Sequence, residues 1–313
     1  MKEKLLIIVG PTAVGKTALS IALAKKFQGE IINGDAVQVY QQLDIGSAKI
    51  TPEEQAGIPH HLIDIRQPNQ SYSVFDFKKD VSQLVTEINN RQKLPIIVGG
   101  TGLYIQSLLF DYHFSETASD KEIQQRLRQK SGEELHQELM LVDEAAAEKI
   151  HPNNVKRLVR ALEVCLTTGK KFSEIGSTAV QNEHYHAAVI GLTMERQMLY
   201  NRINQRVLQM IEAGLEEEVR QLFAAGLEDA QAMQAIGYKE FIPYFKAEKN
   251  LDEVIAAIQQ NSRRFAKRQY TWFRNKMDVN WFEISHPNQI ETDFAPIIDF
   301  AKLFLGKTQE MTK

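Results

Sequence analysis

The sequence is poor in cysteine and has no long hydrophobic run. Cys165 is the one cysteine among 313 residues, which excludes an intrachain disulfide and a cysteine-rich zinc module. It stands in an apolar run, so we expect it in the core. No apolar stretch approaches the roughly 20 residues that cross a bilayer, and the N-terminus leads into a predicted strand instead of a cleavable signal. We therefore expect a cytoplasmic protein that has no membrane association.

An excess of positive charge is also missing. The chain has 37 Lys and Arg against 40 Asp and Glu, a formal net charge of −3, so it is not a polycation overall. For nucleic-acid binding, local clusters of positive charge matter more than the net charge of the chain. Residues 254–276 contain several cations interleaved with aromatics and no acidic residue, and Lys156, Arg157 and Arg160 cluster at helical spacing. Such runs are typical of a solvated helix face or of a nucleic-acid contact, and both interpretations remain open.

The sequence does contain a phosphate-binding loop. This phosphate loop is the octapeptide Gly10-Pro11-Thr12-Ala13-Val14-Gly15-Lys16-Thr17, which follows the apolar run 5–9 and opens an amphipathic segment that ends at Phe27. Small residues let backbone N–H groups surround a phosphate, while the helix dipole and Lys16 neutralise it. The Thr17 hydroxyl is the expected ligand of a magnesium cofactor. The loop predicts polyphosphate binding without identifying the polyphosphate.

Strands and helices alternate through the first hundred residues. Strands are predicted at 5–9, 30–33 and 94–98, and a helix is predicted at 74–91. This alternation predicts a parallel sheet whose ligands gather beyond the carboxyl ends of the strands. Asp35 and Thr101 follow two of these strands, so we expect them on the same edge as the phosphate loop. The predicted fold class is α/β, a P-loop NTPase-like parallel sheet flanked by helices.

The character of the sequence changes near residue 115. Residues 115–186 are charged and helix-forming, with helices predicted at 120–130, 133–140 and 154–168. They predict an inserted all-helical domain, with a catalytic core made of residues 1–114 and 187–313. The remaining core elements are strands at 187–192 and 279–284 and helices at 196–213, 215–224 and 251–276.

Several functions use a phosphate loop on such a sheet. A small-molecule kinase is the default interpretation, with magnesium, an arginine-rich lid and Asp35 as the base. A GTPase is disfavoured because neither a D-x-x-G switch nor an N-K-x-D guanine motif stands in a plausible position. A non-catalytic RNA-binding module is a third interpretation.

A series of motifs in order resembles the tRNA dimethylallyltransferase family, the bacterial tRNA isopentenyltransferases or IPP transferases. The motifs stand at 10–17, 34–40, 43–49, 57–64, 99–104, 156–163, 235–239 and 266–274, and together they span nearly the whole chain. The phosphate loop alone occurs in many families, whereas the eight motifs together are highly specific for this one. Ala36 stands where a serine commonly follows the aspartate, and Val37 and Gln41-Gln42 also differ from the commonest residues. With one cysteine, the chain cannot form the C-terminal zinc finger of eukaryotic relatives.

The resemblance implies transfer of the dimethylallyl group from dimethylallyl diphosphate to the exocyclic N6 amine of the adenosine 3′ of the anticodon, tRNA position 37. The products are N6-isopentenyladenosine and diphosphate, and the phosphate loop holds the leaving group. The amine is a poor nucleophile because its lone pair is conjugated with the ring, so a carboxylate that accepts its proton is useful. Asp35 is the candidate, and capping a helix or holding magnesium through water are its alternatives. The expected partners of this monomer are dimethylallyl diphosphate and the tRNA anticodon stem-loop.

Two further catalytic residues are implied by the resemblance. Thr101 is similar to a threonine that lines the reaction channel, although a glycine-rich turn accommodates threonine for local reasons too. Arg220 matches an arginine that approaches the diphosphate, where negative charge accumulates as the carbon–oxygen bond breaks. Its spacing alone favours a different arrangement, a helix-surface ion pair with Glu216 or Glu217.

The resemblance also implies tRNA contacts, because an enzyme must extrude a stacked adenine before it can modify it. The matching residues are Asp35, Ala36, Val37, Gln38 and Thr101 at the target base, Lys156, Arg157, Leu158, Val159 and Arg160 in the inserted domain, and Gln234, Ala235, Ile236, Gly237, Tyr238 and Lys239 in the core. Gln38 either presents its amide to the base edge or is simply polar after a strand. A related alternative is prenyl transfer to free AMP or ADP; the basic residues of the inserted domain favour the macromolecule.

Overall fold

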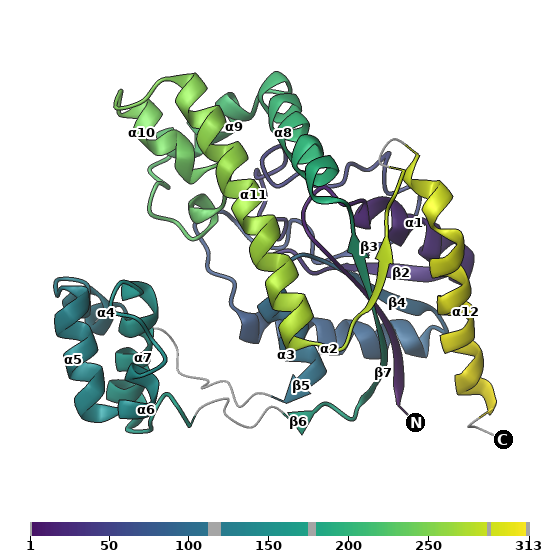
Figure 1. The fold of residues 1–313 in the computed structure, drawn as a ribbon, viewed down its shortest axis with the longest axis horizontal. Coiled ribbons are helices and arrows are strands. Elements are labelled where there is room, and N and C mark those ends of the chain that lie inside the picture. Colours follow the sequence, from purple (N-terminus) through teal and green to yellow (C-terminus); the bar gives the residue numbers. More distant parts are fainter. Residues whose placement is uncertain (1, 112–119, 175–179, 287–288, 311–313) are drawn as a thin grey trace. The chain divides into compact units, whose positions relative to one another are not determined.

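The computed structural model describes residues 2–111, 120–174, 180–286 and 289–310 (Figure 1). The chain divides into two compact units, residues 1–109 with 183–313, and residues 110–182. The predicted insertion, 115–186, starts and ends slightly later. The start differs because β5 (Phe110–Asp111), which pairs antiparallel with β6 (Val180–Gln181) of the same unit, precedes the change in composition. The end differs because β7 (Tyr185–Thr193) of the larger unit begins before residue 187.

The larger unit is built on a six-stranded sheet in the order β3-β2-β4-β1-β7-β8, and every pairing is parallel. Its strands are β1 (Glu3–Val9), β2 (Gly29–Asn33), β3 (His60–His61), β4 (Leu94–Val98), β7 (Tyr185–Thr193) and β8 (Asn280–Glu283). Leu5 to Val9 are fully buried, as expected of a central strand covered on both faces. The predicted parallel α/β sheet is confirmed.

Helices cover both faces of this sheet. On one face lie α1 (Lys16–Phe27) and α12 (Ala295–Glu310), and on the other lie α2 (Val74–Asn90) and α3 (Gly102–Leu109). The unit also contains α8 (Arg196–Glu212), α9 (Leu215–Ala224), α10 (Ile242–Phe245) and α11 (Leu251–Lys276), with short 3₁₀ helices η1 (Ala232–Gln234), η2 (Lys239–Phe241) and η3 (Ile290–Asp293). Helix α12, which lies beside α1 in Figure 1, was not predicted from the sequence.

The side chains of β1 point alternately into two hydrophobic cores, one on each face of the sheet. Leu5 and Ile7 pack into a core with Phe77 of α2 and Phe273 of α11. Leu6 and Ile8 face the opposite core, which includes Leu19 and Leu23 of α1 and Ile297 of α12. Because side chains alternate across a strand, one apolar run anchors both layers of helices. Burial of this run also holds in place the C-terminal end of β1, from which the phosphate loop starts.

The inserted unit has its own core. Its helices are α4 (Lys121–Leu127), α5 (Gly132–Val142), α6 (Glu144–Ala147) and α7 (Val155–Thr168). The core includes Leu127, Leu135, Leu139, Ile150, Leu158 and Leu162. The buried carboxylate of Glu163 accepts hydrogen bonds from the Asp120 N–H, at 2.8 Å, and from Arg160, at 2.7 Å, and so links α7 to the start of α4. Across both units, no helix in the described ranges is long and apolar enough to span a membrane.

Candidate active site

The phosphate loop connects the end of β1 to the start of α1. Its turn uses positive φ angles at Gly10 (145°), Ala13 (65°) and Gly15 (108°). Glycine is required at position 10 for a second reason, because a Cβ there would lie 2.8 Å from the carbonyl oxygen of Leu192. Lys16 is the first residue of α1, so the loop leads directly into the N-terminal amides of that helix. This is the anion-binding geometry that the motif predicts.

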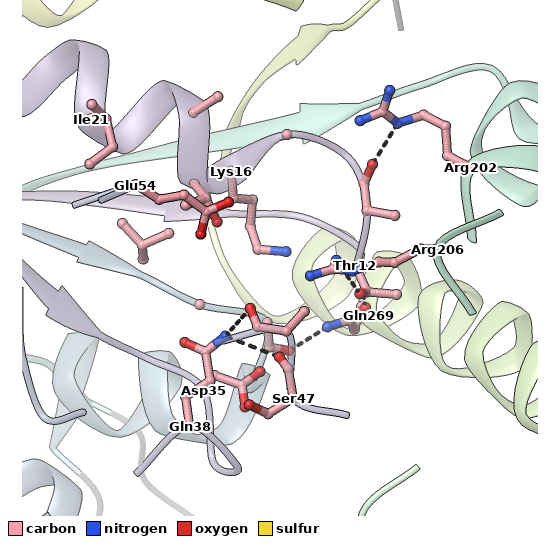
Figure 2. Close-up of a pocket in the computed structure, with 18 of the residues that line it drawn as sticks. Thr12, Lys16, Ile21, Asp35, Gln38, Ser47, Glu54, Arg202, Arg206 and Gln269 are labelled. Atoms are coloured by element: carbon pink, nitrogen blue, oxygen red, sulfur yellow. Dashed lines mark hydrogen bonds between the residues drawn. The ribbon is translucent and has the colours of Figure 1, made fainter. Parts of the chain in front are cut away.

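Two cavities meet at this loop. The first, the loop cavity, has a volume of about 1170 Å³ and is lined by the phosphate loop, Asp35 and Gln38 (Figure 2). The second, the apolar cavity, measures about 600 Å³, and its walls include Ala36, Val37, Ile203, Val207, Met210, Ile236, Ile258, Phe265 and Trp272. Thr12, Asp35 and Arg206 line both. The predicted placement of Asp35 and Thr101 on the edge of the phosphate loop is confirmed, since Thr101 lines the apolar cavity.

Lys16 extends into the loop cavity beside Asp35 (Figure 2). Its Nζ donates hydrogen bonds to the carbonyl oxygens of Gly10, at 3.0 Å, and Pro11, at 2.8 Å. Burial lowers the pKa of Lys16 from 10.5 to about 8, while the charge of Asp35 acts in the opposite direction. At neutral pH the side chain is therefore a cation, and an anion bound in the loop would favour that form further.

Two arginines of α8 complete the cationic wall, and neither was predicted from the sequence. Arg202 donates from Nε to the Ala13 carbonyl oxygen at 2.9 Å, and Arg206 donates to Thr12 Oγ1 at 3.4 Å. Burial lowers the pKa of Arg206, but a guanidinium stays protonated at neutral pH. Their i, i+4 spacing on a helix that directly follows β7 was an available signal, because that strand ends at the edge where ligands gather.

Arg220 does not line either cavity, and its approach to a diphosphate stays a prediction. It pairs with Glu216 and lies 3.7 Å from Glu217, and its side chain is 49% exposed. The guanidinium also stacks over Phe245, 4.9 Å from the ring centre. It lines a surface groove with Tyr244 and Phe245 instead of either cavity. The ion pair and the aromatic stacking hold it on the outer side of α9, as its spacing alone favoured.

Asp35 is held at the junction of the two cavities by its own turn. Its N–H donates to Asn33 Oδ1 at 3.0 Å, and its Oδ1 accepts the N–H of Val37 at 2.8 Å. Oδ2 has no hydrogen-bond partner among the described residues. Residues 35–39 form no helix, so the helix-capping alternative does not apply. The neighbouring Ala36 N–H donates to Thr101 Oγ1 at 3.1 Å, which joins the Asp35 turn to the end of β4.

Gln38 lines the loop cavity and also supports its wall. Its Nε2 donates to the carbonyl oxygens of Ser47 and Ala48, both at 3.2 Å. Its Oε1 has no partner among the residues that the structure describes. The amide nitrogen therefore holds the 47–48 loop, and the carbonyl oxygen is the part of Gln38 that is open to a ligand.

The predicted tRNA segment at 234–239 divides between cavity wall and core. Gln234, Ala235, Ile236, Gly237 and Lys239 line the apolar cavity. Tyr238 is fully buried, and its hydroxyl donates to Glu218 Oε1 at 2.8 Å, so its side chain packs in the core and its contact with tRNA stays a prediction. Glu218 also accepts the N–H groups of residues 44–46, at 2.7 to 3.0 Å. Tyr238 is therefore an anchor for the loops around the cavity.

In the inserted unit, α7 separates into an exposed and a buried face. Lys156 and Arg157 are exposed. Leu158 and Val159 belong to the core, 0% and 4% exposed, so their side chains face away from solvent, and the predicted tRNA contact of this segment stays a prediction. Arg160 donates to the buried Glu163 at 2.7 Å. The helical period explains the division, because residues 158, 159 and 162 share the face that packs on α5.

Comparison with known proteins places this site in a family. The model of the IPP transferase family matches residues 38–276, well over half of the chain. The chain belongs to this family. It is 54% identical over 304 residues to a tRNA dimethylallyltransferase of Geobacillus thermodenitrificans, with 96% of each chain covered. It is 51% identical over 313 residues to that of Geobacillus kaustophilus, with 99% of this chain and 98% of the relative covered.

Solved IPP transferase structures share the fold over nearly the whole chain. A tRNA isopentenylpyrophosphate transferase from Bacillus halodurans is 44% identical, with a TM-score of 0.74 and 99% of each chain covered. A eukaryotic dimethylallyltransferase acting on tRNA is 30% identical, with a TM-score of 0.82, 96% of this chain and 80% of its own chain covered. The resemblance that the motifs predicted is confirmed, as is the P-loop-like fold class.

Proposed function

We propose that this IPP transferase moves a dimethylallyl group from dimethylallyl diphosphate to N6 of adenosine 37 in tRNA, releasing diphosphate. The observation that carries the proposal is the position of Asp35, where a cationic phosphate loop meets an apolar cavity. A diphosphate ester of a branched hydrocarbon needs both environments. The relatives named tRNA dimethylallyltransferase support the same reaction. A monomeric state and a cytoplasmic location stay predictions of the sequence.

The donor diphosphate would lie in the loop cavity. Lys16, Arg202, Arg206 and the first amides of α1 surround this space. As the bond between the allylic carbon and oxygen breaks, its electron pair moves to the diphosphate, and preorganised cations stabilise the charge that develops there. Thr17, exposed on the same cavity, would hold Mg²⁺ together with diphosphate oxygens, and the ion would add positive charge beside the leaving group.

The target adenine and the allylic group would meet in the apolar cavity. The N6 lone pair forms the new nitrogen–carbon bond, and the N6 proton passes to the unpartnered Oδ2 of Asp35. Aliphatic and aromatic walls such as Val207, Met210 and Phe265 exclude water from the electron-poor allylic carbon. Residues 234–237 and 239, on the wall of this cavity, are positioned to contact the extruded nucleotide.

The proposal is tested by measuring whether product formation requires both the donor, dimethylallyl diphosphate, and the acceptor, tRNA. We expect prenyl incorporation and equimolar diphosphate release with dimethylallyl diphosphate and unmodified tRNA, and none when adenosine 37 is replaced by guanosine. A small-molecule kinase would instead consume ATP without tRNA, and an RNA-binding module would bind tRNA without forming product. Prenyl transfer to AMP or ADP in preference to tRNA would contradict the macromolecular acceptor.

Donor capture should depend on pH through Lys16. Its pKa of about 8 means that the free enzyme loses this cation as pH rises above that value. We expect kcat/KM for dimethylallyl diphosphate to level off as pH falls from 8 toward about 7, and to fall about tenfold per pH unit well above pH 8. The K16R variant, whose guanidinium stays charged, should show no such fall up to pH 10, whatever its absolute rate. A wild-type profile that stays flat to pH 10 would remove Lys16 from donor capture.

The inserted unit should contribute tRNA affinity through its exposed cations. Replacing Lys156 and Arg157 together by alanine is expected to weaken tRNA binding and to reduce the salt dependence of log K by about two. Affinity for dimethylallyl diphosphate should not change. The matched control removes two other exposed lysines of the same unit, Lys170 and Lys171. Equal losses in both double variants would indicate a general charge effect instead of a contact by α7.

A further inference from the structure

We propose that Gln269 is a positioning residue, which sets the distance between the donor phosphate loop and the turn that carries Asp35. The inference rests on the proposed function, because it concerns how the two substrates are aligned. Gln269 belongs to α11 and is 4% exposed, yet it lines both cavities. A buried polar side chain at the junction of two substrate spaces requires a reason, since an apolar residue would pack there without desolvation cost.

Both polar atoms of the Gln269 side-chain amide make hydrogen bonds, and their partners belong to two different parts of the site. Oε1 accepts the backbone N–H of Thr12 in the phosphate loop at 3.0 Å. Nε2 donates to the carbonyl oxygen of Gly100, just beyond β4, at 2.9 Å. Figure 2 shows Gln269 next to Thr12 and Arg206 at the edge of the loop cavity. The side chain therefore bridges the loop after β1 and the turn after β4.

The bridge continues to the proposed catalytic carboxylate. Gly100 is followed by Thr101, whose Oγ1 accepts the N–H of Ala36, and Ala36 adjoins Asp35. On the donor side, Thr12 Oγ1 also accepts from Arg206. Hydrogen bonds and two peptide links, Gly100–Thr101 and Ala36–Asp35, thus connect the phosphate loop through Gln269 to the turn of Asp35. The length of this connection matters because bond formation needs the reacting atoms about 3 to 3.5 Å apart.

The glycine at position 100 is explained by the same contact. A Cβ added there would lie 2.1 Å from Gln269 Nε2, a distance that no side chain tolerates. The next nearest atoms are Gln269 Cδ, at 3.4 Å, and the carbonyl oxygen of Gly10, at 3.8 Å, which are ordinary or nearly ordinary contacts. The obstacle at position 100 is therefore the Gln269 amide itself. Shortening Gln269 should make room for alanine at position 100.

This geometry predicts a specific double-mutant cycle. We expect Q269A to lower the single-turnover rate of prenyl transfer by about 10- to 100-fold, with the dissociation constants of tRNA and dimethylallyl diphosphate within about threefold of wild type. G100A should cause a similar loss because it displaces the amide. The double variant G100A/Q269A should be no more than about twofold slower than Q269A. Multiplied losses in the double variant would show that the two residues act separately and would overturn the inference.

Two further variants separate positioning from simple stability. Q259A removes another glutamine of α11, whose Nε2 donates to the Asn204 carbonyl oxygen at 3.4 Å outside both cavities, and should leave the rate unchanged. Q269E keeps an acceptor for the Thr12 N–H but cannot donate to Gly100 as a carboxylate. It should lower kcat more than it raises either KM. A Q269E rate within threefold of wild type, or an effect confined to KM, would overturn the inference.

The activity of the wild-type enzyme shows whether a negative result counts against the proposed function or only against the role of Gln269. If the wild-type protein fails to prenylate tRNA, the proposed function is wrong and the positioning role falls with it. If the wild type is active and Q269A, folded as judged by its thermal transition, retains its single-turnover rate within threefold, the proposed function stands and Gln269 is a structural residue alone.

Discussion

Replacing Asp35 by alanine is expected to slow prenyl transfer by about 100- to 10,000-fold while changing tRNA affinity little. Asp35 Oδ1 is occupied by the Val37 N–H, and Oδ2 is left to accept the proton of the adenine amine. Without that acceptor, the amine must form its new bond while it keeps a proton that the product cannot hold. A single-turnover measurement with saturating donor and tRNA isolates this step from product release.

A control variant and a magnesium titration show whether the loss in D35A reflects proton transfer by Asp35. Asp64, an exposed aspartate paired with Lys49, lines neither cavity, and D64A should stay within about threefold of wild type. If Asp35 holds magnesium instead of taking a proton, raising the magnesium concentration should restore much of the D35A rate, and we expect no such restoration. D35A turnover close to that of wild type would remove this carboxylate from the mechanism.

Replacing Lys16 by alanine is the second large change, with an expected loss of about 100- to 1,000-fold in kcat/KM for dimethylallyl diphosphate. Lys16 begins α1 and reaches the space that the phosphate loop encloses, so its charge adds to that of Arg206 and to the helix dipole. These charges act most strongly on the bond-breaking transition state, where the leaving group gains its full negative charge. Steady-state kinetics with varied donor and saturating tRNA measure the loss.

A second lysine of the same helix provides the matched control for Lys16. Lys26 is exposed in the last turn of α1 and lines neither cavity, so K26A should stay within about twofold of wild type. The tRNA dissociation constant of K16A should also stay near the wild-type value, because the proposed tRNA contacts lie elsewhere. A K16A variant that loses tRNA affinity but keeps its kcat/KM for the donor would contradict the assignment of the loop to the diphosphate.

Much of the framework was predictable because local sequence fixes it. The apolar runs at residues 5–9 and 94–98 are buried strands, and the phosphate loop sits between strand and helix. Parallel pairing then brings the carboxyl ends of different strands to one edge. This is why the sequence alone predicts that Asp35 and Thr101, 66 positions apart in the chain, lie together.

The side-chain assignments were less predictable, because they depend on which face of an element packs inward. Arg202, Arg206 and Arg220 all stand on amphipathic helices, and only the packing of α8 turns the first two toward the phosphate loop. A family motif marks a segment but does not say which members are buried. Leu158, Val159 and Tyr238 belong to such segments, and their side chains pack in cores. Gln269 stayed unassigned because its two partners are distant in sequence.

In the proposed mechanism, the phosphate loop holds the departing diphosphate while the allylic group extends past Asp35 into the apolar cavity. A crystal structure with an unreactive, thio-bridged analogue of dimethylallyl diphosphate would show whether the donor binds in this way. We expect the diphosphate oxygens to contact residues 13–17 and Arg206, with the allylic carbon beside Asp35. An analogue bound elsewhere, or one whose hydrocarbon end points away from Asp35, would contradict it.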